Sequence, residues 1–276
     1  MKKLFLPLIF FCFGISSRAQ TSTELFPDDL IIQSFAANIL EPKLGFLFNF
    51  GGEDLRLDIG NSIDVVRFSF TQEHTLSIGA DLFTYTLLRG EENFHFPVDA
   101  VDYLFGINFG YLNTSGSNEW GTRLRISHIS AHFVDGHYSP SDNSWRDGRN
   151  PQVYSREFIE LMPYYKFNNL RLYAGLTYIF HVDPENLGKD NFQVGFDYFL
   201  KDKISTSITP FAGYDLKVVN LDKRYANHSI SAGVKFGKPN GKGLSIYLHY
   251  YSGKSIHGEY FDLNKTYTSL GFNIDL

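Results

Sequence analysis

The chain of 276 residues contains one cysteine, Cys12, and no apolar run long enough for a membrane-spanning helix. Such a helix needs about 20 consecutive apolar residues. With no second cysteine, an internal disulfide is excluded. The formal net charge of −5 also argues against a nucleic-acid partner, because proteins that bind nucleic acids present basic surfaces.

The first residues have the pattern of a cleaved secretory signal. Lys2 and Lys3 precede an apolar stretch too short to cross a bilayer, and Ser17-Arg18-Ala19 is a small-x-small cleavage site. We therefore expect residues 1–19 to be a signal peptide and the mature chain to begin at Gln20. Because Cys12 lies in this signal, the mature chain would have no thiol chemistry.

From about Leu44 to the C-terminus, apolar residues recur at every second position in short segments separated by turn residues. This alternation is typical of a transmembrane β-barrel, whose outer face meets lipid while its lumen is polar. The candidate strands are Leu44 to Phe50, Ile63 to Phe70, Thr75 to Leu88, Asp99 to Leu112, Trp120 to Phe133, Val153 to Phe167, Leu170 to His181, Asn191 to Leu200, Ser207 to Val219, His228 to Gly237, Leu244 to Ser252 and Thr266 to Leu276. We predict an all-β protein, an antiparallel transmembrane β-barrel of about 12 strands over residues 44–276, located in the cell outer membrane.

The predicted connections alternate in length. Those after even-numbered strands are short, whereas most after odd-numbered strands are longer, notably Val134 to Gln152 and Gly253 to Tyr267. Outer-membrane barrels have short periplasmic turns and longer extracellular loops. The long connections are therefore expected outside the cell.

Charged residues on the strands are expected to face the lumen, because a charge facing lipid at the bilayer midplane costs about 2 to 4 kcal/mol. The expected lumen residues are Arg67, Arg123, Arg125, Arg156, Arg171, Lys217 and Lys235 with Asp81, Asp102, Glu160, Asp197, Asp215 and Asp275. Asp99 and Asp102 are expected to pair with lumen arginines. Because the signs nearly balance, we expect a lumen filled by ion pairs, which disfavours an open small-solute channel.

Residues 20–43 precede the predicted barrel and lack strand alternation. We predict a periplasmic N-terminal strap or plug segment here. Leu30 to Leu40 could form a short amphipathic helix or a strap across the periplasmic mouth, or could enter the lumen. The strap is the favoured alternative.

One strand, Trp120 to Phe133, carries an unusual polar cluster. If its alternation continues, His128, Ser130 and His132 face lipid near the extracellular end, where unpaired polar groups are costly. His128 could accept the proton of Ser130 and make it a nucleophile. Glu157 on the next strand falls opposite His128 and could orient the imidazole. The candidate catalytic residues are therefore Ser130, His128 and Glu157.

The same residues also allow roles without catalysis. The cluster could be an interfacial polar belt, or a bulge near Ile126 to Ile129 could turn it into the lumen. A metal site formed by His128, His132, Asp135 and His137 is disfavoured, because the two strand histidines would lie roughly 13 Å apart.

The His-x-Ser pair with a third polar residue on the adjacent strand resembles the active sites of two outer-membrane families, outer-membrane phospholipase A and the lipid A 3-O-deacylase. The resemblance implies that Ser130 attacks an acyl ester of a membrane lipid. Both families continue with asparagine after the serine, whereas Ala131 and His132 follow here, so no oxyanion donor is assigned. No cofactor is predicted, and no set of residues supports the Ca²⁺ ion that such a site could use.

A broader resemblance extends over most of the mature chain. The segments FPVDAVDY, RLRISHISAH, SREFIEL, LRLYAG, FAGYDLK and YYSGKSIHGEY are similar to an uncharacterised outer-membrane barrel family, domain of unknown function 1207. That family has a His-x-Ser-Ser-His run and an acidic turn, which appear here as His128, Ser130, Ala131 and His132, then Asp135. The resemblance implies a barrel and no established activity.

Three functions follow from these patterns. The favoured one is a structural or accessory barrel of the envelope, with other outer-membrane proteins as partners. The first alternative is a lipid acyl hydrolase acting on lipid A or phospholipid, with outer-membrane lipids as partners. The second alternative is the small-solute channel.

Overall fold

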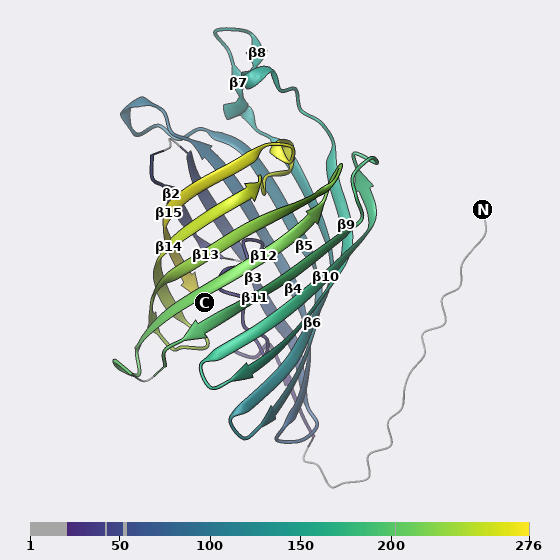
Figure 1. The fold of residues 1–276 in the computed structure, drawn as a ribbon, viewed down its shortest axis with the longest axis vertical. Coiled ribbons are helices and arrows are strands. Elements are labelled where there is room, and N and C mark those ends of the chain that lie inside the picture. The colour runs from purple at the N-terminus through teal and green to yellow at the C-terminus, as the bar shows by residue number, and fades with distance from the viewer. Residues whose placement is uncertain (1–20, 42, 52–53, 202, 276) are drawn as a thin grey trace, which may run out of the picture.

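The computed structural model describes residues 21–41, 43–51, 54–201 and 203–275. The predicted signal peptide, residues 1–19, and Gln20 lie outside the described residues. Within them, twelve antiparallel strands form a closed barrel, because β15 pairs with β2 and β2 with β3 (Figure 1). The strands are β2 (Leu44–Asn49), β3 (Asp54–Ser69), β4 (His74–Arg89), β5 (Val98–Ser115), β6 (Asn118–Phe133), β9 (Tyr154–Phe167), β10 (Leu170–Asp183), β11 (Asp190–Phe199), β12 (Ile208–Asn220), β13 (Arg224–Gly237), β14 (Gly243–Lys254) and β15 (Asn264–Asp275). The predicted fold class is confirmed.

Several strands are longer than their sequence pattern indicated, and β3 and β13 begin well before their predicted starts. β3 begins at Asp54 instead of Ile63, and β13 at Arg224 instead of His228. In β3 the polar run Gly60-Asn61-Ser62 interrupts the apolar alternation, although pairing with β4 continues through it. Strand pairing therefore extended these segments where side-chain periodicity was weak.

The connections define two different ends of the barrel. At the turn end they are residues 70–73, 116–117, 168–169, 200–207 and 238–242. At the loop end, uppermost in Figure 1, the longer connections contain η1 (Glu92–Phe94), η2 (Asp135–His137), β7 (Tyr138–Ser139), β8 (Ser144–Trp145), η3 (Arg146–Gly148) and η4 (Gly258–Tyr260). The β7–β8 hairpin projects beyond the barrel wall.

Most of the outer face of the barrel is an apolar surface. Outward-facing side chains such as Leu82, Tyr178 and Leu248 are more than half exposed, and their strand neighbours are buried inside. A surface of this kind matches the hydrocarbon region of a bilayer. Among the described residues, no helix is long and apolar enough to span a membrane.

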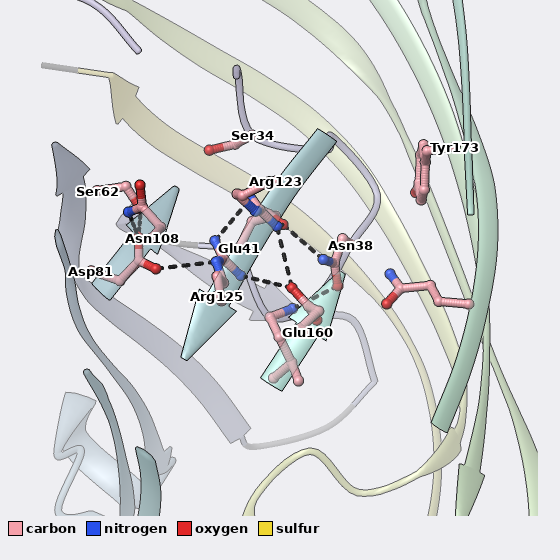
Figure 2. Close-up of polar contacts among 12 residues, drawn as sticks. Ser34, Asn38, Glu41, Ser62, Asp81, Asn108, Arg123, Arg125, Glu160 and Tyr173 are labelled. Atoms are coloured by element: carbon pink, nitrogen blue, oxygen red, sulfur yellow. Dashed lines mark hydrogen bonds and ion pairs between the residues drawn. The ribbon is translucent and has the colours of Figure 1, made fainter. Parts of the chain in front are cut away.

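Ion pairs fill the middle of the lumen (Figure 2). Glu41 accepts hydrogen bonds from Arg123 at 2.6 and 2.8 Å and from Arg125 at 3.3 Å. Arg125 also lies 3.1 Å from Asp81 and 3.5 Å from Glu160. Although burial alone would raise the pKa of Glu41, Arg123 and Arg125 lower it to about 2, so this carboxylate is ionised at neutral pH.

The predicted lumen residues do face inward. All are buried except Arg67 and Asp275, which are partly exposed at the turn end. Arg171 pairs with Asp197, Lys217 lies 3.8 Å from Glu160, and Lys235 lies 2.7 Å from Asp275. The alternation of the strands therefore assigned their charged faces correctly.

Glu41 belongs to the N-terminal segment, which enters the lumen. β1 (Ser22–Leu25) pairs with Val66–Ser69 of β3, and the following chain passes between the barrel walls. Of the two alternatives from the sequence, this is the one that was not favoured. The alternative of a helix over Leu30 to Leu40 is wrong, because these residues form turns, bends and irregular chain.

The plug segment forms no helix in its described residues, and side chains of the barrel wall bond to its main-chain groups instead. Arg171 donates to the carbonyls of Gln33 and Ser34, both at 2.7 Å, and Asp197 accepts the amide of Ala36 at 3.0 Å. Phe35 is fully buried, with its ring beneath the Arg171 guanidinium. Buried main-chain groups require such partners, so the polar wall determines the path of the segment.

An apolar cluster closes the lumen toward the loop end. Its buried wall residues include Phe83, Leu104 and Phe158, and Leu40 of the plug segment and Phe261 of the β14–β15 loop pack against it. A cavity of about 430 Å³ remains at the turn end, between the plug segment and the wall. We call this cavity the vestibule. The ion-pair layer and the apolar cluster therefore close the lumen between the vestibule and the loop end.

Replacing Glu41 tests the ion-pair layer. Glu41→Gln leaves Arg123 and Arg125 buried with less compensating charge, so we expect the barrel to lose about 3 kcal/mol of unfolding free energy. Urea unfolding of protein refolded in lipid vesicles measures this loss. The matched control is Glu24→Gln, because Glu24 is half exposed and 3.5 Å from Arg67, and should change stability by less than about 1 kcal/mol. Equal effects of the two substitutions would contradict the buried network.

The closed lumen predicts a low conductance. Purified protein in planar lipid bilayers should show no steady open level, because ion pairs and the apolar cluster leave no continuous aqueous path. Single-channel recording, with a porin measured in the same membranes as the positive control, provides the test. A large, stable and non-gating conductance would refute the closed lumen.

Candidate functional site

The polar cluster of β6 lies on the outer face of the barrel. Arg123, Arg125 and Ser127 are buried in the lumen, whereas the alternate positions, including His128 and Ser130, are partly exposed on the other face. Pairing of β6 with β5 and β9 is continuous and contains no register shift. The alternative of a bulge that turns the cluster inward is therefore wrong.

His128 and Glu157 are brought together as predicted. They are direct cross-strand partners on β6 and β9, and His128 Nδ1 lies 2.5 Å from Glu157 Oε1. About a quarter of each side chain is exposed. Because a carboxylate only accepts hydrogen bonds, Nδ1 of the imidazole must carry the proton, and Nε2 is left with the lone pair.

Ser130 shares this face without contacting His128. It lies two residues further along β6, which separates the two Cα atoms by about 6 to 7 Å. Its cross-strand partner is Ser155, whose hydroxyl donates to Glu157 Oε1 at 3.5 Å. Among the described residues, no hydrogen bond joins Ser130 to His128. A hydrogen bond between the imidazole and the hydroxyl would therefore require a change of side-chain rotamer.

A fourth polar residue, His181 of β10, was missed from the sequence. Its Nδ1 lies 2.5 Å from the other oxygen of Glu157, Oε2. The pairing of β9 with β10 shifts register between Ile179 and His181. Ile179 and Val182 both point into the lumen while Phe180 and His181 point outward. The signal in the sequence that could have indicated this bulge is the pair of apolar residues Ile179 and Val182, which are three positions apart instead of two.

Aromatic rings flank the cluster on its β5 side. The Phe105 ring lies 4.9 Å from the ring of His128, and the Tyr103 ring lies 6.0 Å from that of His132. Toward the barrel middle, the outward residues are Ile126 and Ile159. The polar site is therefore surrounded by apolar side chains of the outer face and lies close to the loop end.

The residues considered for a metal site are not assembled. His137 is buried, with Nδ1 3.0 Å from Asp99 and Nε2 3.2 Å from the carbonyl of Arg149. Within the described part of the chain, no group of three or more histidine, cysteine or acidic residues is arranged to hold a metal ion.

A second polar cluster joins the loops inside the loop end. Asp102 accepts hydrogen bonds from His257 Nδ1 at 2.8 Å and from the Gly258 amide at 2.7 Å. Tyr260 donates to Asp99, which also pairs with Arg89. Among the residues that the structure describes, the expected arginine partner is thus present for Asp99 but not for Asp102.

Two loop residues of this second cluster, Glu259 and Tyr260, have raised pKa values. Burial, and then the neighbouring Asp99, raises the pKa of Tyr260, which keeps its hydroxyl a donor. Burial also raises the pKa of Glu259, whose carboxyl accepts the amides of Phe133 and Gln152 at 3.2 and 3.4 Å. Because every group has a partner inside the cluster, it acts as a latch that closes the loop end.

Comparisons with known proteins agree with this fold. The family described as "Protein of unknown function (DUF1207)" matches residues 94–275. Outer membrane phospholipase A from Escherichia coli is similar in structure, with a TM-score of 0.51 and 13% identity over 88% of this chain and 94% of that chain. An active-site mutant of the same enzyme, in which an asparagine is changed to alanine, has a TM-score of 0.53 and 13% identity over 88% and 95% of the two chains. No curated protein matches in sequence. At this identity the likeness shows the fold, which is that of an outer-membrane barrel.

The orientation of β6 can be tested with two single-cysteine variants, because the predicted mature chain has no cysteine. Ser130→Cys should carry a nitroxide label that lipid-dissolved oxygen relaxes strongly. Ser127→Cys is the matched control, since Ser127 is buried in the lumen and should resist labelling in the folded barrel. Electron paramagnetic resonance in vesicles measures both. Labelling of Ser127→Cys alone would reverse the assigned faces.

Proposed function

The chain belongs to the DUF1207 family of proteins of unknown function, and we propose that this member is an outer-membrane barrel that hydrolyses acyl esters of membrane lipids at its outer face. The observation that carries the proposal is the 2.5 Å contact between His128 Nδ1 and Glu157 Oε1, with Ser130 on the same face. The similar fold of a phospholipase supports the same class of substrate.

The proposed reaction is acyl transfer through the serine. Glu157 holds His128 with its Nε2 free, and Nε2 takes the proton as Ser130 Oγ attacks the acyl carbonyl carbon. The carbon–oxygen bond to the lipid alcohol breaks, and the imidazolium returns its proton to the departing alcohol. Water then cleaves the acyl-serine by the same steps and releases the fatty acid. Glu157 stabilises the positive charge that His128 carries during each step.

The closed lumen bears on how substrate reaches this site. Because ion pairs and apolar side chains fill the barrel, a lipid would arrive laterally along the outer face. The apolar residues around the cluster, such as Phe105 and Ile126, would contact the acyl chain. The proposed partners are therefore lipids of the outer leaflet. In this proposal the long loops lie outside the cell, and the signal peptide is removed during export.

The oxyanion of the tetrahedral intermediate has no assigned donor. Ala131 follows Ser130 and faces the lumen, and His132 is the next residue on the outer face. We propose no resident cofactor, and assays with and without Ca²⁺ test whether an added cation substitutes for such a donor.

An accessory or structural barrel is the second candidate. It is favoured by the absence of a Ser130–His128 hydrogen bond within the described residues, where His128 contacts Glu157 instead. In this role the cluster would bind lipid headgroups or another outer-membrane protein. The third candidate, a solute channel, has no observation in its favour.

Replacement of Ser130 separates the first two candidates. Wild-type protein in mixed micelles should release fatty acid from phospholipid or lipid A, and Ser130→Ala should abolish the release because the nucleophile is lost. Glu157→Gln should lower the rate less, since an orienting group is partly replaceable. Mass spectrometry of the released fatty acid measures these rates.

The control for Ser130→Ala is its folding. Heat-modifiable electrophoretic migration should be unchanged, because a small hydroxyl on the outer face contributes little to packing. Release of no fatty acid by the wild type, from either lipid class and with Ca²⁺ supplied, would refute the enzyme proposal and leave the accessory role.

A further inference from the structure

The bulge in β10 places His181 on the outer face of the barrel. Regular alternation after Ile179 would turn His181 into the apolar lumen cluster, where its polar ring would lack a partner. The extra residue keeps Ile179 and Val182 in that cluster and leaves His181 outside, beside Glu157. Bulges next to functional sites commonly redirect one side chain in this way.

Both carboxylate oxygens of Glu157 consequently accept a hydrogen bond from a histidine. Oε1 accepts from His128 of β6 and Oε2 from His181 of β10, each at 2.5 Å, while Ser155 donates weakly to Oε1. A carboxylate held by one imidazole can rotate about its terminal bond. With a second imidazole on the other oxygen, the carboxylate plane is defined by three neighbouring strands.

We infer that His181 is a positioning residue of the proposed active site, which holds the Glu157 carboxylate so that its other oxygen stays directed at His128 Nδ1. The inference rests on the proposed function for its catalytic meaning. His181 itself is mostly exposed and lies away from Ser130, so it takes no proton from the substrate.

Nuclear magnetic resonance tests the shared contact without requiring turnover. In wild-type protein in detergent micelles, with ¹⁵N-labelled histidine, the His128 Nδ1 proton that bonds to Glu157 should give a downfield ring N–H signal; the signal lost in His128→Gln identifies it. In His181→Ala the same signal should shift, because Glu157 Oε2 loses its donor. His132→Gln is the matched control, because His132 is an outward histidine with no hydrogen bond to Glu157 among the described residues, and should leave the signal in place. An identical signal in wild type and His181→Ala would overturn the inference.

Kinetics test the positioning role. His181→Ala should lower kcat about tenfold with little change in KM, because the interaction acts on the base rather than on lipid binding. His181→Gln keeps a neutral donor for Oε2 and should recover most of that loss. An unchanged kcat in His181→Ala would overturn the positioning role. Absence of activity in the wild type would instead refute the proposed function, while the resonance measurement would still decide whether His181 and His128 share Glu157.

Discussion

The structure depends on the pairing of charged side chains inside the barrel. Charges on the strands are costly when they face an apolar environment, and inside the lumen they are costly to leave unpaired. Glu41 of the plug segment is the partner of both Arg123 and Arg125, so wall and plug require each other. The path of residues 30–41 through the lumen follows from this need more than from any secondary structure of their own.

Closure of the lumen restricts where chemistry can occur. The ion-pair layer and the apolar cluster separate the loop end from the vestibule, and the Asp102–His257 and Asp99–Tyr260 contacts hold the loops over the barrel. The segments FPVDAVDY and SIHGEY, on which much of the family resemblance rested, meet in this latch. These two segments thus contact each other at the loop end, whereas the His-x-Ser pair lies on the outer face.

Much of the candidate site could be predicted because it depends on two local rules. Residues two apart on a strand share a face, and hairpin partners lie opposite one another, which was enough to place His128, Ser130 and Glu157 together. His181 could not be found this way. Its position depends on a bulge whose cause is the packing of Ile179 and Val182 in the lumen, and that packing involves strands distant in sequence.

By itself, the sequence determined the number of strands, their inner and outer faces, the long-loop end and the phase of β6. These follow from a period of two, which neighbouring residues are sufficient to establish. Only the tertiary structure decided that the N-terminal segment fills the lumen, that β3 extends back to Asp54, and that His257 rather than arginine pairs with Asp102. These arrangements join residues from opposite parts of the chain, and they exist only after barrel closure has brought the buried charges and apolar side chains within reach of their partners.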